Sequence, residues 1–346
     1  MYLIRTSFEQ VLADVREQSA QGERKTKTEV MTELILIIGI AQFLIPLLLL
    51  FWQWRERSAS KVQWLFKTIL AVSYLIAIAL VGLWNVLPFF VPYLYLSTSL
   101  TLVVRGFLRI RKIAFWKVKT RRERIAFGLT ALLAVLTSTL AIYALSAWRI
   151  PPGDAVQLAF PLKDGTFYIA NGGSNSLLNP HLETLEGERY RSWRGQSYAV
   201  DILQINRWGL RANGFLPADP AQYRMFDTPV HAPCAGTILE TENGREDLPP
   251  PRADRTYLPG NHVLIDCGEF LVLLAHFRKG SVAVTTDQQV EVGQTLGQVG
   301  NSGNTGEPHL HIHAQRRGTQ PTTLDGEPLW ILFDDKFLVR NQLVVR

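Results

Sequence analysis

Three long runs without a charged residue constrain the fold of this 346-residue chain more than any other feature. They cover Leu34–Trp54, Thr68–Val104 and Ala126–Trp148, with 21, 37 and 23 residues. A helix of about 20 apolar residues crosses the hydrocarbon core of a bilayer. Core helices of soluble proteins rarely lack charges over such lengths. A cleavable signal peptide does not fit either, since more than 30 residues precede the first run. The runs therefore predict membrane-spanning helices.

The 37-residue run is too long for a single crossing. Asn85, Pro88 and Pro92 lie near its middle and favour a turn. We interpret the run as two helices, at roughly 65–84 and 88–104, joined by a tight hairpin. The sequence thus predicts an all-α unit of four spans in a lipid bilayer, within residues 31–148. Residues 1–30 form a separate N-terminal segment, in which apolar residues at helical spacing suggest a short amphipathic helix.

Basic residues predict the orientation of the spans. The 105–125 loop carries nine Lys/Arg against Glu123 alone, and the loop after the first run is also basic. Such short loops stay on the cytoplasmic side. Both loops can be cytoplasmic only if an even number of spans lies between them. The hairpin divides the 37-residue run into two spans, so the basic loops support it. Residues 1–30 and everything after Trp148 are then extracytoplasmic.

Charge is unevenly divided along the chain. Residues 1–150 carry 19 Lys/Arg against 8 Asp/Glu, whereas residues 151–346 carry 17 against 22. The positive charge thus belongs to the membrane unit, so the high pI does not predict a nucleic-acid partner. Binding of RNA or anionic lipid by the 105–125 loop is the alternative to its topological role.

The second half has the pattern of a mostly antiparallel β-domain. Residues 149–158, which include Pro151, Pro152 and Gly153, are interpreted as a linker, and residues 159–346 as the domain. Short runs with strand character alternate there with turn residues. The runs are Thr166–Ala170, Tyr198–Gln204, Gly236–Glu240, Asn261–Asp266, Glu269–Ala275, Thr295–Val299, His309–Ala314 and Lys336–Val339. Residues 241–260, with four prolines and seven charges, are expected to form an exposed hairpin loop.

Histidines point to metal chemistry in this domain. All seven histidines of the chain lie in the second half, and three of them alternate at His309, His311 and His313. Alternate side chains of a strand share one face. Three imidazoles on one face make a poor apolar core and a good zinc site. The preceding Gly300–Gly306 turn is rich in residues that permit close backbone approach.

These segments resemble the lysostaphin/LytM-type zinc metallopeptidases, which cut peptide bonds in peptidoglycan. The resemblance rests on GNSGNTGEPHLHIH at 300–313, on DTPVHAPCAGTILE at 227–240, on GNHVLIDCGEFLVLLAHF at 260–277 and on VEVGQTLGQVG at 290–300. Together they extend the resemblance over roughly 155–335 in the family's order and spacing. The resemblance implies a metallopeptidase fold and one Zn²⁺ per chain.

The resemblance also implies roles for individual residues. His311 and Asp201 correspond to zinc ligands, and His276 and His309 to catalytic histidines. The chain departs from the family at Ser197, where many members have the third ligand. Some members instead have an Asn-x-His segment upstream, and on that likeness His181 is assigned as the ligand. His313 is expected to support the ligands from behind, and His231 and His262 to be structural.

The two cysteines of the chain, Cys234 and Cys267, fall on either side of the predicted 236–265 hairpin. Paired residues of an antiparallel hairpin have a constant sum of residue numbers, and Cys234–Cys267 has the same sum as Glu240–Asn261. The cysteines could therefore face each other, and an extracytoplasmic location permits a disulfide. Two free thiols are the alternative.

The sequence thus predicts a multi-pass protein of the bacterial cytoplasmic membrane whose extracytoplasmic domain is a zinc metalloendopeptidase acting on peptidoglycan. One alternative is a catalytically silent relative that binds cell wall or activates a hydrolase. Another is a zinc peptidase with a protein or peptide substrate. The bond cleaved and the oligomeric state stay open at this stage.

Overall fold

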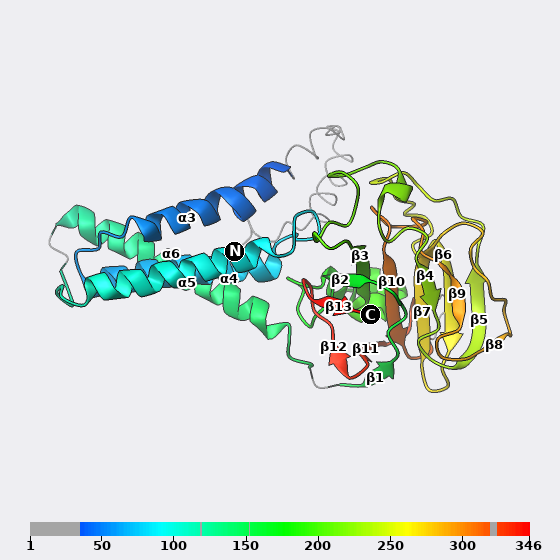
Figure 1. The fold of residues 1–346 in the computed structure, drawn as a ribbon. Coiled ribbons are helices and arrows are strands. Elements are labelled where there is room, and N and C mark those ends of the chain that lie inside the picture. The colour runs from blue at the N-terminus through cyan, green and yellow to red at the C-terminus, as the bar shows by residue number, and fades with distance from the viewer. Residues whose placement is uncertain (1–34, 118–119, 152, 319–323) are drawn as a thin grey trace, which may run out of the picture. The chain divides into compact units, whose positions relative to one another are not determined.

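The computed structural model describes residues 35–117, 120–151, 153–318 and 324–346 (Figure 1). The predicted amphipathic helix within residues 1–30 lies outside this range. The chain divides into two compact units. Among the described residues, one unit consists of 35–83 together with Phe90–Leu145, and the other of Trp84–Phe89 together with Ser146–Arg346.

The first unit is helical and confirms the predicted all-α fold. Four helical segments of the described chain are long and apolar enough to cross a membrane, with mean hydropathies between 1.2 and 2.6. The first segment starts at Ile35 and contains a π-helical stretch. The elements are η1 (Gly39–Leu44), α3 (Ile45–Trp54), α4 (Lys61–Val81), α5 (Val91–Ile110) and α6 (Arg121–Ser146).

The helix ends differ from the predicted bounds for local reasons. Helix α4 begins at Lys61, because the Ser60 side chain accepts a hydrogen bond from the backbone N–H of Gln63 and caps the helix. Helix α5 has Pro92 in its first turn and runs on to Ile110, beyond the apolar run. Proline fits a first turn because no helical hydrogen bond is required of its nitrogen there. The break between α4 and α5 confirms the predicted hairpin.

Polar side chains join the helices inside the first unit. Ser99 Oγ donates to Gln53 Oε1 at 2.9 Å, and Ser73 Oγ lies 2.6 Å from Thr137 Oγ1. Such contacts contribute about 0.6 kcal/mol each in a bilayer. Large apolar side chains instead cover the outside, as Leu129 and Ile142 of α6 do with exposed fractions of 57% and 68%. This outward apolar surface suits contact with lipid chains.

The second unit is built on a mostly antiparallel sheet, as predicted. Its strands are β1 (Ala155–Leu158), β2 (Thr166–Asn171), β3 (Val200–Ile205), β4 (Pro229–His231), β5 (Gly236–Glu242), β6 (Asn261–Asp266), β7 (Leu271–Phe277), β8 (Gln289–Val290), β9 (Thr295–Gln298), β10 (Leu310–Gln315), β11 (Pro328–Phe333), β12 (Lys336–Phe337) and β13 (Leu343–Val345). Three short 3₁₀ helices accompany them: η2 (Pro180–Thr184), η3 (Glu188–Tyr198) and η4 (Pro220–Gln222).

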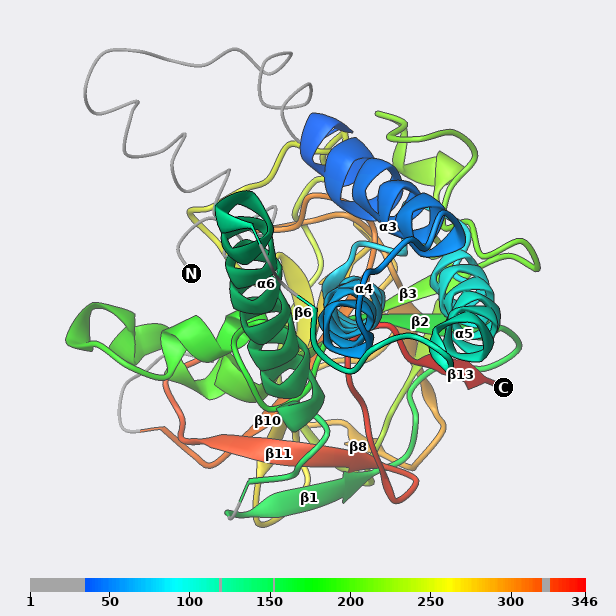
Figure 2. The ribbon, with the colours of Figure 1, turned by 90° about the vertical axis from the view of Figure 1, so that its left-hand side faces the viewer.

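The strand order brings distant segments together. The main path of the larger sheet is β13-β2-β3-β10-β7-β6-β5-β8, and β4 pairs with β9 separately. Strand β11 joins the sheet through β10 and pairs with β1 in parallel, the one parallel pair among the described strands (Figure 2). The interpretation of residues 149–158 as a linker was therefore wrong for Ala155–Leu158. That pairing depends on β11, about 175 residues away, which no local pattern reveals.

The apolar core lies against one face of this sheet. Alternate residues of the central strands point into it, among them Ile202 of β3, Leu274 of β7 and Ile312 of β10. A smaller cluster on the other side contains Leu264, Leu271, Leu273, Ala275 and Leu324. The residues that alternate with these core-facing ones point to the opposite face of the sheet, where the candidate site is located.

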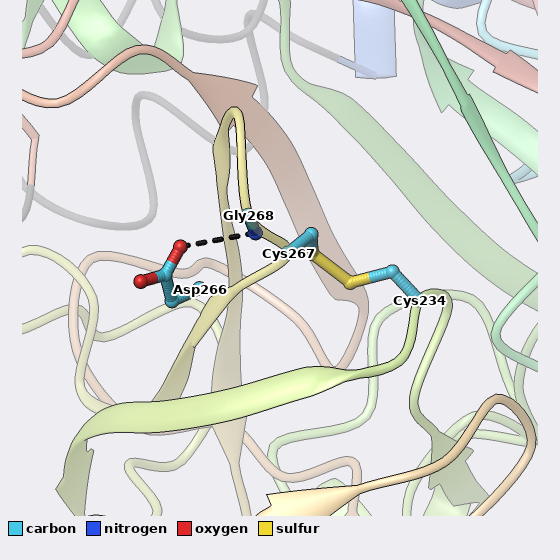
Figure 3. Close-up of a disulfide and its surroundings, with 4 residues drawn as sticks. All are labelled: Cys234, Asp266, Cys267 and Gly268. Atoms are coloured by element: carbon cyan, nitrogen blue, oxygen red, sulfur yellow. Dashed lines mark hydrogen bonds between the residues drawn. A yellow bond between two sulfur atoms is a disulfide. The ribbon is translucent and has the colours of Figure 1, made fainter.

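A disulfide joins Cys234, before β5, to Cys267, after β6 (Figure 3). Its Cα–Cα distance of 6.0 Å is ordinary for a disulfide. The register from which the pairing was predicted was wrong, because Glu240 pairs with Leu264 and not with Asn261. An irregularity between Ile238 and Glu240 shifts the ladder. Beside the cysteines, Thr237 pairs with Asp266, so Cys234 and Cys267 lie close together at that end of the ladder without being directly opposite each other.

Candidate metal and catalytic site

The centre of the site is a row of residues that face one another across three strands. Asn171 of β2 pairs with Asp201 of β3, and Asp201 pairs with His311 of β10. Directly opposed residues of antiparallel strands have their Cβ atoms about 5 Å apart on the same face. On its other side His311 pairs with Ala275 of β7, and His276 follows at once. The sheet register therefore collects polar side chains that are up to 140 residues apart in sequence.

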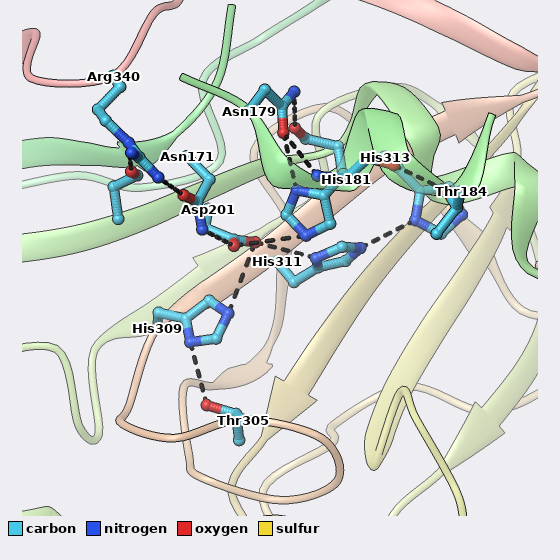
Figure 4. Close-up of polar contacts among 12 residues, drawn as sticks. Asn171, Asn179, His181, Thr184, Asp201, Thr305, His309, His311, His313 and Arg340 are labelled. Atoms are coloured by element: carbon cyan, nitrogen blue, oxygen red, sulfur yellow. Dashed lines mark hydrogen bonds and ion pairs between the residues drawn. The ribbon is translucent and has the colours of Figure 1, made fainter. Parts of the chain in front are cut away.

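His181 reaches this row from the 3₁₀ helix η2 (Figure 4). Asn179 precedes the helix and its Oδ1 accepts a hydrogen bond from the His181 backbone N–H at 3.2 Å. The same Oδ1 lies 3.0 Å from Nδ1 of the His181 ring. An amide oxygen only accepts, so Nδ1 carries the proton and Nε2 keeps its lone pair. Nε2 lies 3.5 Å from Asp201 Oδ2.

His311 is oriented in a matching way by its neighbours. Its Nδ1 lies 2.9 Å from Asp201 Oδ1, and its Nε2 lies 3.1 Å from Nδ1 of His313. All three residues are buried. The partner at Nε2 fixes the ring, so that Nδ1 is the nitrogen presented to Asp201. His313 thus contacts His311 on the side away from Asp201.

His276 and His309 form a second pair beside these residues. Their ring centroids are 4.8 Å apart, and that of His276 is 5.7 Å from that of His311. His276 Nδ1 lies 2.8 Å from the Ser302 carbonyl oxygen, and His309 Nδ1 lies 2.9 Å from that of Glu307. A carbonyl accepts only, so both Nδ1 atoms carry protons, and Nε2 of a neutral ring keeps its lone pair. His309 Nε2 lies 3.5 Å from Asp201 Oδ1.

The backbone at His276 has a φ of +69°, in the left-handed region. A residue other than glycine is uncommon there and costs of order 1–3 kcal/mol, and such residues cluster at functional sites. The register of β6 and β7 shifts next to it, between Asn261 and His262. Hydrogen bonds at 3.0 Å to Pro259 O and at 2.8 Å from Gly300 N hold the peptide groups of His276. The strand is therefore bent where it delivers this ring.

The Gly300–Gly306 turn orients both of these histidines. Ser302 supplies the carbonyl for His276, and Thr305 Oγ1 lies 3.1 Å from His309 Nδ1. The turn packs against Gly260, where a Cβ would lie 2.3 Å from the Ser302 carbonyl carbon. The absence of a side chain at Gly260 thus allows the backbone of the Gly300–Gly306 turn to pack directly against it.

Burial and mutual contact shift the pKa values of the cluster. Burial lowers the pKa of His181 to about 4 and that of His276 well below its usual value. Burial acts in the same direction on His309, but the Asp201 carboxylate outweighs it and raises the pKa of His309. Burial would raise the pKa of Asp201, yet the surrounding histidines hold it well below its usual range. Without a metal, Asp201 is therefore ionised while His181 and His276 are neutral at pH 7.

The donor set of this cluster fits a metal ion such as zinc. One ligand atom from each of His181, Asp201 and His311 lies within 4.8 Å of the others, and the group His276, His309 and His311 meets the same limit. Donors about 2.1 Å from a tetrahedral Zn²⁺ lie about 3.4 Å apart. His311 Nδ1 lies 2.9 Å from Asp201 Oδ1, and His181 Nε2 lies 3.5 Å from the other oxygen, Oδ2, so both rings are within reach of an ion held by this carboxylate. Only the first group contains a carboxylate to offset the charge of a cation.

The other predicted residues lie apart from these contacts. Ser197, buried in η3, bonds Thr184 Oγ1 at 2.8 Å and the Arg194 carbonyl at 2.7 Å. His262 is buried, with Nδ1 2.9 Å from the Gly260 carbonyl oxygen. His231 lies 3.4 Å from Thr295. All three have structural contacts.

Comparison with known proteins gives the family of this domain. Residues 222–323 match the profile described as peptidase family M23. Residues 222–323 are therefore a peptidase family M23 domain, which covers less than half of the chain. The match contains His276, His309 and His311, whereas His181 and Asp201 lie upstream of it. Comparison with curated proteins gave no match.

Several solved structures are similar to parts of the chain. The catalytic domain of the antimicrobial peptidase lysostaphin from Staphylococcus simulans has 22% identity and a TM-score of 0.24, over 36% of this chain and 69% of that domain. The solution structure of lysostaphin is covered over 38% of its length. The crystal structure of a putative peptidase M23 from Pseudomonas aeruginosa has 20% identity and a TM-score of 0.23, over 58% of this chain and 59% of that chain.

Several residues that orient the candidate site were not predicted from the sequence. Asn171, Thr305 and Arg340 are among them, and Asn179 appeared only as part of a family motif. Asn179 had a signal of its own, because asparagine before proline is typical of a helix N-cap. Arg340 had none, since it is about 140 residues from Asp201 and no spacing relates them.

Proposed function

We propose that this protein is a membrane-anchored zinc metalloendopeptidase that hydrolyses peptide bonds in peptidoglycan. The observation that carries the proposal is the buried cluster of His181, Asp201 and His311. In each imidazole one ring nitrogen is bonded to Asn179 or His313, and the other ring nitrogen lies beside the Asp201 carboxylate. In this structure His311 Nδ1 donates its proton to Asp201, and a bound metal would take the place of that proton. Such a set suits a catalytic zinc, which has three protein ligands and an open position.

The residues around this cluster suit peptide hydrolysis. A bound Zn²⁺ supplies Lewis acidity toward a carbonyl group and lowers the pKa of water. His276 and His309 hold their Nδ1 protons on backbone carbonyls, so their Nε2 atoms are available to the substrate. One of them would remove a proton from the attacking water and deliver it to the leaving amine. The other would donate to the oxygen that gains charge in the transition state.

Peptidoglycan as substrate is supported by topology and by family. The basic 105–125 loop predicts that the M23 domain is extracytoplasmic, on the side of the cytoplasmic membrane where cell wall lies. The Cys234–Cys267 disulfide is in keeping with an oxidising compartment. The resemblance to lysostaphin-type enzymes adds the substrate class. The four helices anchor the domain close to that substrate.

The test uses the full chain purified in detergent. Metal content is measured, and products from purified peptidoglycan are identified by mass. We expect one zinc per chain and release of peptide fragments. His181→Ala, Asp201→Ala and His311→Ala should lose zinc and activity together, because two protein ligands hold zinc poorly. Ser197→Ala is the matched control and should keep both.

The catalytic pair gives a separate readout. His276→Ala and His309→Ala should retain zinc and lose turnover by about 10²–10⁴-fold, the usual contribution of proton transfer. A zinc-loaded parent that releases nothing from peptidoglycan would favour the silent cell-wall-binding alternative. Cleavage of proteins but not of peptidoglycan would favour the other alternative. If His181→Ala keeps full zinc and activity, His181 is not a ligand and His313 becomes the next candidate.

A further inference from the structure

Arg340 is a buried cation next to the candidate metal site, with 6% of its surface exposed. It follows β12 in the chain, and within the described residues it forms no ion pair with a carboxylate. Its guanidinium is satisfied by oxygen acceptors instead. Nε donates to Ala170 O at 2.8 Å, Nη1 donates to Leu177 O at 3.4 Å, and Nη2 donates to Asn171 Oδ1. Burial of a guanidinium costs free energy unless its N–H groups are hydrogen-bonded in this way. The burial of Arg340 beside the candidate metal site therefore indicates a specific role there.

Asn171 links this cation to Asp201. Its Nδ2 donates to Asp201 Oδ2 at 2.8 Å, while its Oδ1 accepts from Arg340 (Figure 4). A guanidinium has donors only, so it determines which end of the amide faces it. The amide oxygen must point to Arg340, and the amide nitrogen must then point to Asp201. A shift in the β2–β3 register between Ile169 and Asn171 brings Asn171 directly opposite Asp201.

This chain of bonds distinguishes the two carboxylate oxygens of Asp201. Oδ2 accepts from Asn171 and lies 3.5 Å from His181 Nε2. Oδ1 lies 2.9 Å from His311 Nδ1 and 3.5 Å from His309 Nε2, which face the interior of the cluster. The hydrogen bond from Asn171 thus occupies one lone pair of Oδ2, whereas within the described residues the polar contacts of Oδ1 are to histidines of the cluster only. It also resists rotation of the carboxylate.

We propose that Arg340 and Asn171 are positioning residues that hold Asp201 so that Oδ1 is its metal-binding atom. This inference rests on the proposed metal site. Neither side chain is among the residues proposed to touch the substrate. Arg340 sets the direction of the Asn171 amide, and Asn171 sets the direction of the carboxylate. Removal of either should weaken metal binding without removing a ligand.

The test measures the zinc affinity of the full chain in detergent by competition with a chelator. We expect Asn171→Ala to bind zinc 10- to 100-fold more weakly, the usual effect of losing a hydrogen bond behind a metal ligand. Arg340→Lys keeps the charge, but its donors radiate from one nitrogen and lack the planar spread of the guanidinium that reaches three acceptors, so it should weaken binding as well. If Arg340→Lys binds zinc with the affinity of the parent, the proposed role of the Arg340 guanidinium is overturned.

The matched control is Asn243→Ala. Asn243 also uses both ends of its amide, with Val282 N and Val282 O as partners, and bonds no residue of the site. It should lower the melting temperature as Asn171→Ala does and leave zinc affinity unchanged. If Asn171→Ala does not fold, Asn171→Ser carries the same expectation, because its shorter side chain cannot span Arg340 and Asp201.

The outcomes separate this inference from the proposed function. Asn171→Ala or Asn171→Ser with zinc affinity within twofold of the parent overturns the positioning role alone. A drop in affinity of equal size in Asn243→Ala also overturns it, because the effect would then be general destabilisation. A parent that binds no zinc overturns the proposed metal site, and this inference with it.

Discussion

The Cys234–Cys267 disulfide should make a large contribution to the stability of the M23 domain. It closes a sequence separation of 33 residues. The loop-entropy relation gives about 3.7 kcal/mol at 25 °C for a loop of this size. For a domain of 150–250 residues, this corresponds to a fall of roughly 7–15 °C in melting temperature. We therefore expect Cys234→Ser/Cys267→Ser to lower the free energy of unfolding by about 2–4 kcal/mol.

The assay is pulse proteolysis of the full chain in urea, followed through a C-terminal tag. The parent should unfold at lower urea concentration when a reductant is present, whereas the double variant should be insensitive to reductant. Zinc affinity should be equal in both proteins. Cys267 follows Asp266, which pairs with Leu271 at the start of β7, whereas His276 lies near the other end of that strand.

Two results would refute this reasoning. One is a urea midpoint of the parent that reductant does not move. The other is two free thiols in denatured, unreduced protein, which would mean that the bond does not form in the cell. Loss of zinc in the double variant would contradict a narrower point, namely that the bond stabilises the fold without shaping the site.

Three further predictions concern pH, metal and topology. Burial lowers the pKa of His181 to about 4 in the metal-free protein, below the value of about 6.5 in the unfolded chain. As pH falls, His181 is protonated in the unfolded chain before it is protonated in the folded protein. Its contribution therefore lowers the free energy of unfolding of the metal-free protein between about pH 6.5 and pH 4. A midpoint near 6.5 in an NMR titration of the His181 ring would contradict this prediction. Removal of zinc by a chelator should destabilise the parent by about 2.7 kcal/mol relative to zinc at 100 times its Kd, and should leave His311→Ala unchanged in a thermal melt. A reporter fused after Arg346 should be active only outside the cytoplasm, and one inserted near Lys117 only inside; the reverse pattern would exclude access to cell wall.

The helices and the central strands could be predicted because their signals are local. The thickness of the bilayer sets the length of an apolar run, and Asn85, Pro88 and Pro92 divide the longest one. Likewise, alternation alone puts His309, His311 and His313 on one face of a strand, and strand β6 was predicted with its observed bounds, Asn261–Asp266.

The arrangement around these elements was decided only by tertiary structure. Strand β1 exists because β11 pairs with it, and the ladder between β5 and β6 shifts at an irregularity that the residue numbers do not reveal. His181 was assigned from family likeness, and the bend through η2 brings its ring to Asp201. The Arg340–Asn171–Asp201 chain had no sequence signal at all. Periodicity depends on neighbours within a few residues, whereas cross-strand register and side-chain partners depend on segments farther along the chain, from about 25 residues for β5 and β6 to about 175 for β1 and β11.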